Sequence, residues 1–304
     1  MENITMNLPV IKARPYISPS ALATWGDCQY KFWLQYLSNY PWIKPEPSLA
    51  GTIGNVFDCY VKADIAMNRS MNRIDLKLDN MLAKLKKDVG PEIFEEAHRI
   101  GSVVAGQYLH NNMHQEILDA KDIILDREIW SLVNSIPILG IPDCVVDGVV
   151  MDWKTRGFIS KTLPSPTKGY RGRWGHDNVP KGVKDWPEGT CLEEANIGWA
   201  RQMLFYNWML KSSVDSWNPT TLRYKIHEII KTKDGWDLCV HSGVLSMFFE
   251  AKVLLELTEL WESINSLDAE IMDPAPNNWR CKKYGQLCQV ASYCDRFKEW
   301  VIEE

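Results

Sequence analysis

The sequence has no apolar run long enough to span a membrane, which takes about 20 consecutive apolar residues. Its first sixteen residues, MENITMNLPVIKARPY, lack the basic start and apolar core of a signal peptide. Internal repeats and low-complexity tracts are also missing. We therefore expect a cytoplasmic globular protein without a membrane partner.

An excess of basic residues is absent too, because the net charge is −5 at pH 7. This argues against a protein that coats nucleic acid without specificity, since such proteins are usually basic. It does not exclude a nuclease, because metal-binding carboxylates count as negative until the metal binds. The sequence is instead rich in tryptophan, with 14 residues, some of which could stack on bases.

The order of elements is more informative than the composition. The 304 residues read as helices, then three strands, a helix, two strands and a last helix. This order predicts an α/β fold with a mixed sheet flanked by helices and with helical additions. Residues 75–118 read as a helical insertion that is interrupted at Gly90-Pro91, and residues 157–190 read as a long loop. Near the N-terminus, Ser18 and Pro19 are suited to start a helix.

One stretch, GIPDCVVDGVVMDWKT from Gly140 to Thr155, predicts a β-hairpin. Asp147-Gly148 between two runs rich in valine favours a two-residue turn, because both residues tolerate positive φ. The turn pairs Val146 with Val149 and sets Asp143 opposite Asp152. Their side chains then share one face of the sheet with Lys154.

Two opposed carboxylates repel each other unless positive charge lies between or beside them. A divalent cation together with the ammonium of Lys154 would supply that charge. On this stretch alone, an exposed charged face screened by Lys154 explains the pattern equally well, so the rest of the chain has to decide.

The eight cysteines are unevenly spread. Cys28 stands alone near the N-terminus, whereas Cys281, Cys288 and Cys294 crowd the C-terminus. In a cytosolic chain such crowding indicates a metal site rather than disulfides. The isolated cysteines are most simply buried small hydrophobic residues: Cys59, Cys144, Cys191 and Cys239.

Several motifs together resemble a known family. Pro142-Asp143 followed by Asp152-Trp153-Lys154 resembles the signature of the PD-(D/E)XK nuclease superfamily. QMLFY, from Gln202 to Tyr206, resembles the Q-x-x-x-Y motif of its RecB-type branch, and its two polar residues share one helix face. One early cysteine and a late trio resemble the iron–sulfur members, which include the nuclease of CRISPR adaptation and the AddB-type nuclease domain. The resemblance touches residues 17–37, 51–60, 125–155, 199–206 and 276–297, in the family's order.

The resemblance implies a restriction-endonuclease-like fold and a site that holds Mg²⁺ or Mn²⁺. It implies that the cation is bound by Asp143, Asp152 and the backbone carbonyl of Trp153, with Asp58 standing where the branch usually has a histidine. Lys154 would act on the attacking water, and Gln202 and Tyr206 would position the substrate or the lysine; the implied catalytic set is Asp143, Asp152, Lys154, Gln202 and Tyr206. Glu128 could add a carboxylate, although an exposed strand residue is the simpler reading.

For the cysteines, the resemblance implies a [4Fe–4S] cluster bound by Cys28, Cys281, Cys288 and Cys294. Residues 274–298 would close this cluster site with the N-terminal helix, within a single nuclease domain spanning residues 1–304. Four thiolates suit zinc as well as iron–sulfur clusters, so structural zinc stays an alternative. The six residues between Cys281 and Cys288 are more than many relatives have.

The function that follows is a metal-dependent DNA nuclease, an exonuclease acting on single strands or duplex ends in DNA processing, recombination or repair. Its partners would be DNA and a helicase or recombination protein. The alternative is a catalytically silent module that binds nucleic acid or assembles with other proteins while keeping the nuclease fold. Intact Asp143, Asp152 and Lys154 favour the enzyme, whereas Asp58 in place of histidine leaves room for the silent module.

Overall fold

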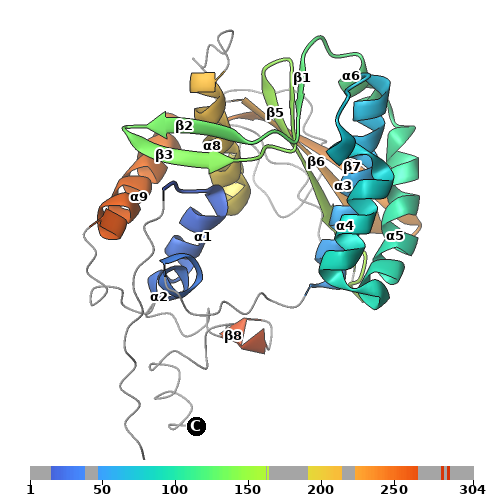
Figure 1. Cartoon of the computed structure of the whole chain (residues 1–304), viewed down its shortest axis with the longest axis horizontal. Helices are drawn as coiled ribbons and strands as arrows, with labels where there is room; N and C mark the ends of the chain where they lie inside the picture. Colours follow the sequence, from blue (N-terminus) through green and yellow to red (C-terminus); the bar gives the residue numbers. More distant parts are fainter. Residues whose placement is uncertain are drawn as a thin grey trace, which may run out of the picture. The chain divides into compact units, whose positions relative to one another are not determined.

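The computed structural model describes residues 15–37, 47–161, 163, 191–213, 223–265, 282–283 and 286–287 (Figure 1). The chain divides into two compact units. The first comprises residues 1–45, 130–139 and 248–304, and the second comprises residues 46–129 and 140–247. All predicted site residues outside the cysteine cluster belong to the second unit.

The first unit contains the N-terminal helices, α1 (Pro19–Asp27) and α2 (Gln29–Phe32), followed by a π-helical turn (Trp33–Leu37). Ser18 caps α1 as predicted, because its Oγ accepts a hydrogen bond from the Ala21 amide at 3.3 Å and Pro19 opens the helix. The helical stretch breaks at Cys28, whose extended backbone separates α1 from α2. The Cys28 thiol then caps α2 by accepting from the Lys31 amide at 3.5 Å.

The other described elements of this unit are a two-stranded sheet, a long helix and a short ladder. β2 (Ile129–Val133) pairs with β3 (Ile136–Gly140), and Ile17 forms an isolated bridge with Ile138. Helix α9 runs over Met247–Asn265. β8 (Lys282–Lys283) pairs with β9 (Gln286–Leu287).

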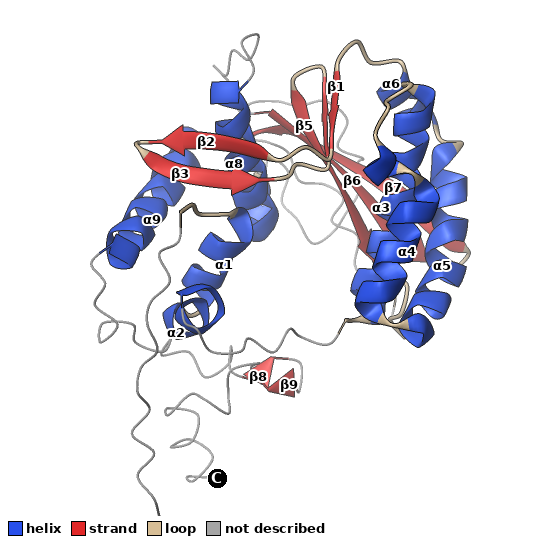
Figure 2. Cartoon of the chain, in the orientation of Figure 1, coloured by secondary structure: helices blue, strands red, loops and turns tan. Residues whose placement is uncertain are grey.

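The second unit is built on a five-stranded mixed sheet in the order β1-β4-β5-β6-β7 (Figure 2). Its strands are β1 (Ile123–Leu125), β4 (Cys144–Val146), β5 (Val149–Arg156), β6 (Arg223–Thr232) and β7 (Gly235–Val244). The β5–β6 pair is parallel and the other pairs are antiparallel. The predicted fold class, a mixed α/β sheet flanked by helices, is confirmed.

Helices cover both faces of this sheet. They are α3 (Leu49–Asn68), α4 (Leu78–Val89), α5 (Pro91–Leu109), α6 (Asn112–Leu118), α7 (Leu192–Ala195) and α8 (Ile197–Ser213), with a 3₁₀ turn at Ile74–Leu76. Trp153 of β5 donates from its indole nitrogen to the Tyr108 hydroxyl of α5 at 2.9 Å, so odd-numbered β5 residues face α3 and α5. Asp152 and Lys154 alternate to the opposite face, where α8 lies.

Residues 75–118 are helical as predicted, and Gly90 separates α4 from α5 with φ of 85°. Helix α5 lies tightly against α3, since a Cβ on Gly101 would come within 2.9 Å of the Ile53 carbonyl oxygen. Tyr108 of α5 shares a buried core with Phe57 of α3 and Trp153 of β5. This segment therefore contributes to the core beneath the sheet.

Within the described residues, five strands precede α8, whereas the sequence predicted three. The stretch DIILDREIWSLV, which begins at Asp122 and was counted as the first of those three, is divided between β1 and β2, and β3 was not predicted. The reason is local: Asp126 takes a positive φ of 45°, which turns the chain out of β1 before β2 begins. None of the helices in the described part of the chain is long and apolar enough to cross a membrane.

Candidate active site

The predicted hairpin forms with the predicted register. Cys144 pairs with Met151, Val145 with Val150, and Val146 with Val149. Asp147 and Gly148 have φ of 47° and 76°, the two positive angles of a type I′ turn. β4 ends opposite Met151, whereas β5 continues alongside β6. The residues of β5 that carry the predicted chemistry therefore lie beyond the end of β4, where β5 is paired with β6 alone.

Asp143 and Asp152 lie next to each other just beyond the last pair of β4 and β5. Asp143 immediately precedes β4, one position beyond the last paired residue, and its side chain is 20% exposed. Asp152 lies within β5 and its side chain is fully buried. The two side chains lie close enough for the Asp143 carboxylate to raise the pKa of the Asp152 carboxyl. The hairpin thus brings the two carboxylates together.

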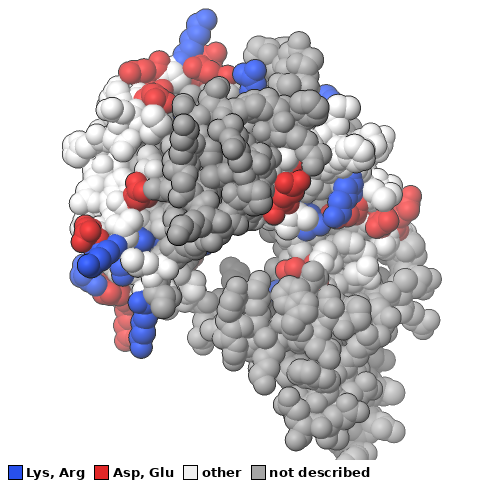
Figure 3. Space-filling model, turned by 180° about the vertical axis from the view of Figure 1, so that it is seen from behind, with Lys and Arg blue, Asp and Glu red and all other residues white. Residues whose placement is uncertain are grey.

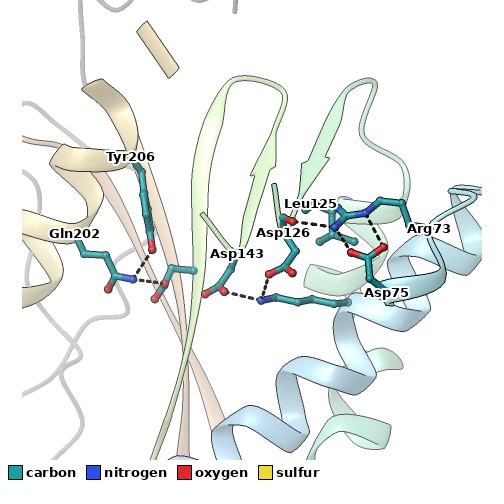
Figure 4. Close-up of polar contacts among 9 residues, drawn as sticks. Arg73, Asp75, Leu125, Asp126, Asp143, Gln202 and Tyr206 are labelled. Atoms are coloured by element: carbon teal, nitrogen blue, oxygen red, sulfur yellow. Dashed lines mark hydrogen bonds and ion pairs between the residues drawn. The ribbon is translucent and has the colours of Figure 1, made fainter. Parts of the chain in front are cut away.

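The other predicted catalytic side chains surround Asp152. The ammonium of Lys154 forms an ion pair with Asp152 Oδ2 and donates to Gln202 Oε1 at 3.1 Å. Gln202 Nε2 lies 3.3 Å from Asp152 Oδ1 and 2.9 Å from the Tyr206 hydroxyl (Figure 4). One turn of α8 therefore holds the glutamine and the tyrosine against the β5 residues.

A lysine that the sequence analysis missed completes the cluster. Lys62 Nζ donates to Asp143 Oδ1 and to Asp126 Oδ1, both at 2.8 Å. Its side chain is only 9% exposed. Lys62 follows Asp58 by four residues on α3, so both occupy one face of the helix. A lysine within the apolar run DCYVKADIAM was the signal that could have revealed it.

Asp126 is the second residue that was missed. It follows β1 directly, and its backbone amide donates to the Asp143 carbonyl at 3.1 Å. Arg73 holds the end of β1 in place by donating to the carbonyls of Leu125 and Asp126, at 2.6 and 3.1 Å. Its guanidinium also pairs with Asp75 (Figure 4). Glu128, the carboxylate suggested instead, is exposed between β1 and β2, which agrees with the simpler reading given above.

The pKa values of Asp58 and Asp152 show that the nearby ammonium groups only partly offset burial and the repulsion between carboxylates. Burial raises the pKa of Asp58 well above its ordinary value, and the nearby Asp143 carboxylate raises it further. Burial also raises the pKa of Asp152, to about 7, with Asp143 adding to the effect while Lys154 opposes it. Burial raises the pKa of Asp143 as well, but Lys62, Asp152 and Lys154 together outweigh burial and hold it below the usual value.

The donor set suits a hard divalent cation, which prefers carboxylate and carbonyl oxygens. The raised pKa values of Asp58 and Asp152 are those expected of carboxylates that the positive charge of a cation would stabilise. The carbonyl of Trp153 is a further candidate. Because Val146 and Val149 close a two-residue turn, the alternation of ladder bonds points the Trp153 carbonyl toward the side that β4 has vacated.

The arrangement is not a finished metal centre. Among the residues that the structure describes, no three His, Cys, Asp or Glu side chains are disposed as a ready metal-binding group. The physical reason lies in the two ammonium groups, because Lys62 and Lys154 hold Asp143 and Asp152 in ion pairs. A cation would have to reorient these carboxylates.

The predicted cysteine site is only partly visible. Cys28 lies at the break between α1 and α2 with its thiol partly exposed. Cys59, Cys144, Cys191 and Cys239 are buried, as expected for small apolar side chains. Cys281, Cys288 and Cys294 lie outside the described residues, as does most of the predicted loop 157–190.

Comparison with known proteins supports the fold and goes no further. No family model matches the chain, and no curated protein matches its sequence. Among solved structures, a protein from Eubacterium rectale described as a candidate exonuclease is 14% identical, with a TM-score of 0.57, over 93% of this chain and 88% of that one. A second structure, SSO0001, is 15% identical over 81% of this chain and 93% of that one, and its TM-score of 0.31 carries no weight. The chain thus shares the fold of a protein described as a candidate exonuclease.

Proposed function

We propose that the protein is a DNA nuclease that depends on Mg²⁺ or Mn²⁺ and acts as an exonuclease on single strands or duplex ends. The observation that carries the proposal is the Lys154 ammonium, which is paired with Asp152 and hydrogen-bonded to Gln202, with the Asp143 carboxylate close enough to raise the pKa of Asp152. This chemistry serves phosphodiester hydrolysis, which requires an activated water and positive charge near the phosphate oxygens. The likeness in fold to a candidate exonuclease supports the same class.

Each side chain has a role that its contacts support. Asp143, Asp152 and the Trp153 carbonyl would bind the cation, with Asp58 as a further carboxylate. The bound cation would supply the charge that activates water and stabilises the phosphate. Lys154 would orient or deprotonate that water and stabilise the charge that develops on the phosphate.

Gln202 and Tyr206 would position the reacting groups. The Gln202 amide contacts both Lys154 and Asp152, and the Tyr206 hydroxyl accepts from the same amide. Such a chain of hydrogen bonds fixes the direction of the Lys154 ammonium, which a flexible four-carbon side chain does not fix alone.

We also propose that Cys28, Cys281, Cys288 and Cys294 bind a [4Fe–4S] cluster, with structural zinc as the alternative. The partly exposed thiol of Cys28 supports this, because the other described cysteines are buried. The partners would be DNA and a helicase or recombination protein, and the process would be DNA processing, recombination or repair.

One observation favours the rival function, a catalytically silent module that binds nucleic acid. Lys62 already neutralises Asp143, and the usual histidine is replaced by Asp58. In the silent module, Lys62 would be a permanent substitute for the cation. The two functions differ in whether a divalent cation binds at the cluster and whether DNA is cut.

Cation binding and DNA cleavage by the parent separate the two functions, and replacing Lys154 then tests the role assigned to it. Lys154→Met keeps most of the side-chain volume and loses the charge, so Mn²⁺ should still bind in calorimetry while turnover on labelled DNA falls by roughly two to four orders of magnitude. The matched control is Lys225→Met on the neighbouring strand β6, which removes an ammonium paired with Glu116 of α6 and should leave turnover unchanged. Turnover of Lys154→Met within severalfold of the parent would refute the assigned role.

A further inference from the structure

Arg156 ends β5 on the same face as the candidate catalytic residues. It lies two positions beyond Lys154 and four beyond Asp152, and alternation places all three side chains on the α8 face of the sheet. Its side chain is 36% exposed, compared with 23% for Lys154. An arginine therefore stands beside the site, accessible to a bound substrate.

The guanidinium is directed back toward the site by a buried acid. Arg156 Nη1 lies 2.6 Å from Glu228 Oε1 on β6, and Glu228 is fully buried. In the parallel register, Glu228 pairs with Lys154, whereas Arg156 pairs with Ile230. The arginine side chain thus reaches two residues back along the sheet, to the level of the lysine.

The acid is held in turn from the next strand. Glu228 Oε2 lies 2.7 Å from His241 Nε2 on β7, and His241 is also fully buried. The two oxygens of Glu228 therefore have separate partners, one on each neighbouring strand. This leaves the carboxylate little freedom and fixes the guanidinium that depends on it.

Stability alone explains this arrangement poorly. Burying a carboxylate in a central strand is costly, and well-packed apolar residues in place of a buried ion pair are often neutral or stabilising. An arginine held by one terminal nitrogen keeps further donors in the fork geometry that suits phosphate. Within the described ranges, Glu228 is the acidic partner of Arg156.

The surface charge adds to the argument. On the face shown in Figure 3, Lys and Arg are scattered among Asp, Glu and uncharged residues, and no broad basic patch appears among the described residues. The whole chain is also net negative. Binding of a phosphate backbone to these residues would then depend on a few positioned cations.

We propose that Arg156 binds a backbone phosphate of the DNA adjacent to the scissile one, and that Glu228 and His241 position its guanidinium. The proposal rests on the proposed nuclease function and adds a substrate-binding residue to it. Arg156 is a substrate contact, whereas Glu228 and His241 act through it.

The test is the salt dependence of DNA binding. Asp152→Asn protein, which should not cut, would be titrated against a fluorescent single-stranded oligonucleotide at several salt concentrations. Adding Arg156→Gln should weaken binding about tenfold. It should also reduce the slope of log affinity against log salt by about 0.7, the contribution of one phosphate contact on a single strand. A purely structural role would lower the melting temperature and leave that slope unchanged.

Two further variants guard against misfolding. Arg156→Lys keeps the charge, so the slope should persist while affinity falls by a smaller factor than with glutamine. Arg99→Gln breaks an arginine–glutamate pair of the same 2.6 Å length on α5, which covers the opposite face of the sheet. It should change neither the slope nor the affinity.

Once Arg156 is glutamine, adding Glu228→Gln should have no further effect on DNA affinity, because a positioning residue acts only through the residue it positions.

The outcomes separate this inference from the nuclease proposal. If Asp152→Asn protein binds DNA and both Arg156 variants keep its slope and affinity, the inference is wrong while the nuclease proposal stands. If the parent neither binds nor cuts DNA, the nuclease proposal fails and the inference fails with it.

Discussion

Lys62 Nζ lies 2.8 Å from both Asp126 Oδ1 and Asp143 Oδ1, so one buried ammonium joins the end of β1 to the start of β4. Burial alone lowers the pKa of Lys62, but Asp143, Asp58 and Asp126 outweigh it and raise the pKa above its usual value. The lysine is therefore charged at any ordinary pH and acts as an internal cation. It supplies part of the positive charge that the proposed divalent cation would bring.

Removing this ammonium should destabilise the protein and increase its dependence on metal. Lys62→Met leaves Asp126 and Asp143 without their counter-charge, so the free energy of unfolding should fall by roughly 3–5 kcal/mol. Mn²⁺ should then raise the melting temperature of the variant more than that of the parent. Lys86→Met, which removes an exposed lysine paired with Glu95, is the control. Equal Mn²⁺ shifts in parent and Lys62→Met would contradict a shared role for lysine and metal.

Metal affinity should rise with pH. Below about pH 7 the Asp152 carboxyl holds a proton that a cation has to displace, because burial and Asp143 raise its pKa to about 7. Binding of Mn²⁺ should therefore tighten by about tenfold per pH unit from pH 5 to 6.5 and level off above pH 7. Calorimetry in two buffers of different ionisation enthalpy measures the proton released. An affinity independent of pH over this range would argue against Asp152 as a ligand.

Acid should destabilise the protein through His227, whose side chain faces α5, on the side of the sheet opposite Lys154 and α8. Burial lowers the pKa of this histidine to about 3, whereas the unfolded chain has the ordinary value near 6.5. Between these values the unfolded state binds more protons, so stability is complete above pH 6.5 and declines as the pH falls toward 3. The loss at pH 5 is about 2 kcal/mol relative to pH 7.

His227→Gln provides the comparison, because glutamine can still bond to the Tyr108 hydroxyl that His227 Nδ1 contacts at 2.6 Å. Its stability should depend less on pH between 6.5 and 4 than that of the parent, in urea titrations. Parallel pH profiles for the two proteins would show that another group governs acid unfolding.

The proposed iron–sulfur cluster predicts a coloured protein. Protein purified without oxygen should be brown with about four irons per chain, and Cys28→Ser should bleach it. Cys239→Ser, at a buried cysteine of the second unit, should keep the colour. Stoichiometric zinc in colourless protein would replace the cluster with a structural zinc site, and protein with neither metal would refute a shared cysteine site.

The hairpin was predictable because the residues that specify it are close together in the sequence. Asp147-Gly148 defines the turn, and the period of two along each strand then sets Asp143 beside Asp152 and Lys154. Gln202 and Tyr206 needed the family motif, since nothing local places α8 against β5. The α4–α5 break was predictable for the same reason as the hairpin, as Gly90-Pro91 stops a helix.

The two site residues that were missed make contacts between segments distant in sequence. Lys62 and Asp126 are 64 residues apart, and their pairing depends on how α3 packs against the end of β1. No periodicity encodes that packing. The division of β1 from β2 escaped notice because LDREI has no glycine or proline, and the turn is made by Asp126 with a positive φ.

Digestion of end-labelled DNA by the parent and by Asp152→Asn tests the central claim most directly. Asparagine keeps the volume of the buried side chain, so the variant should fold and melt like the parent. With Mg²⁺ or Mn²⁺ the parent should shorten the labelled strand, chelation by EDTA should stop it, and Asp152→Asn should leave the DNA intact. Cleavage by the variant at the parent's rate, or a parent that leaves DNA intact with both cations, would contradict the account.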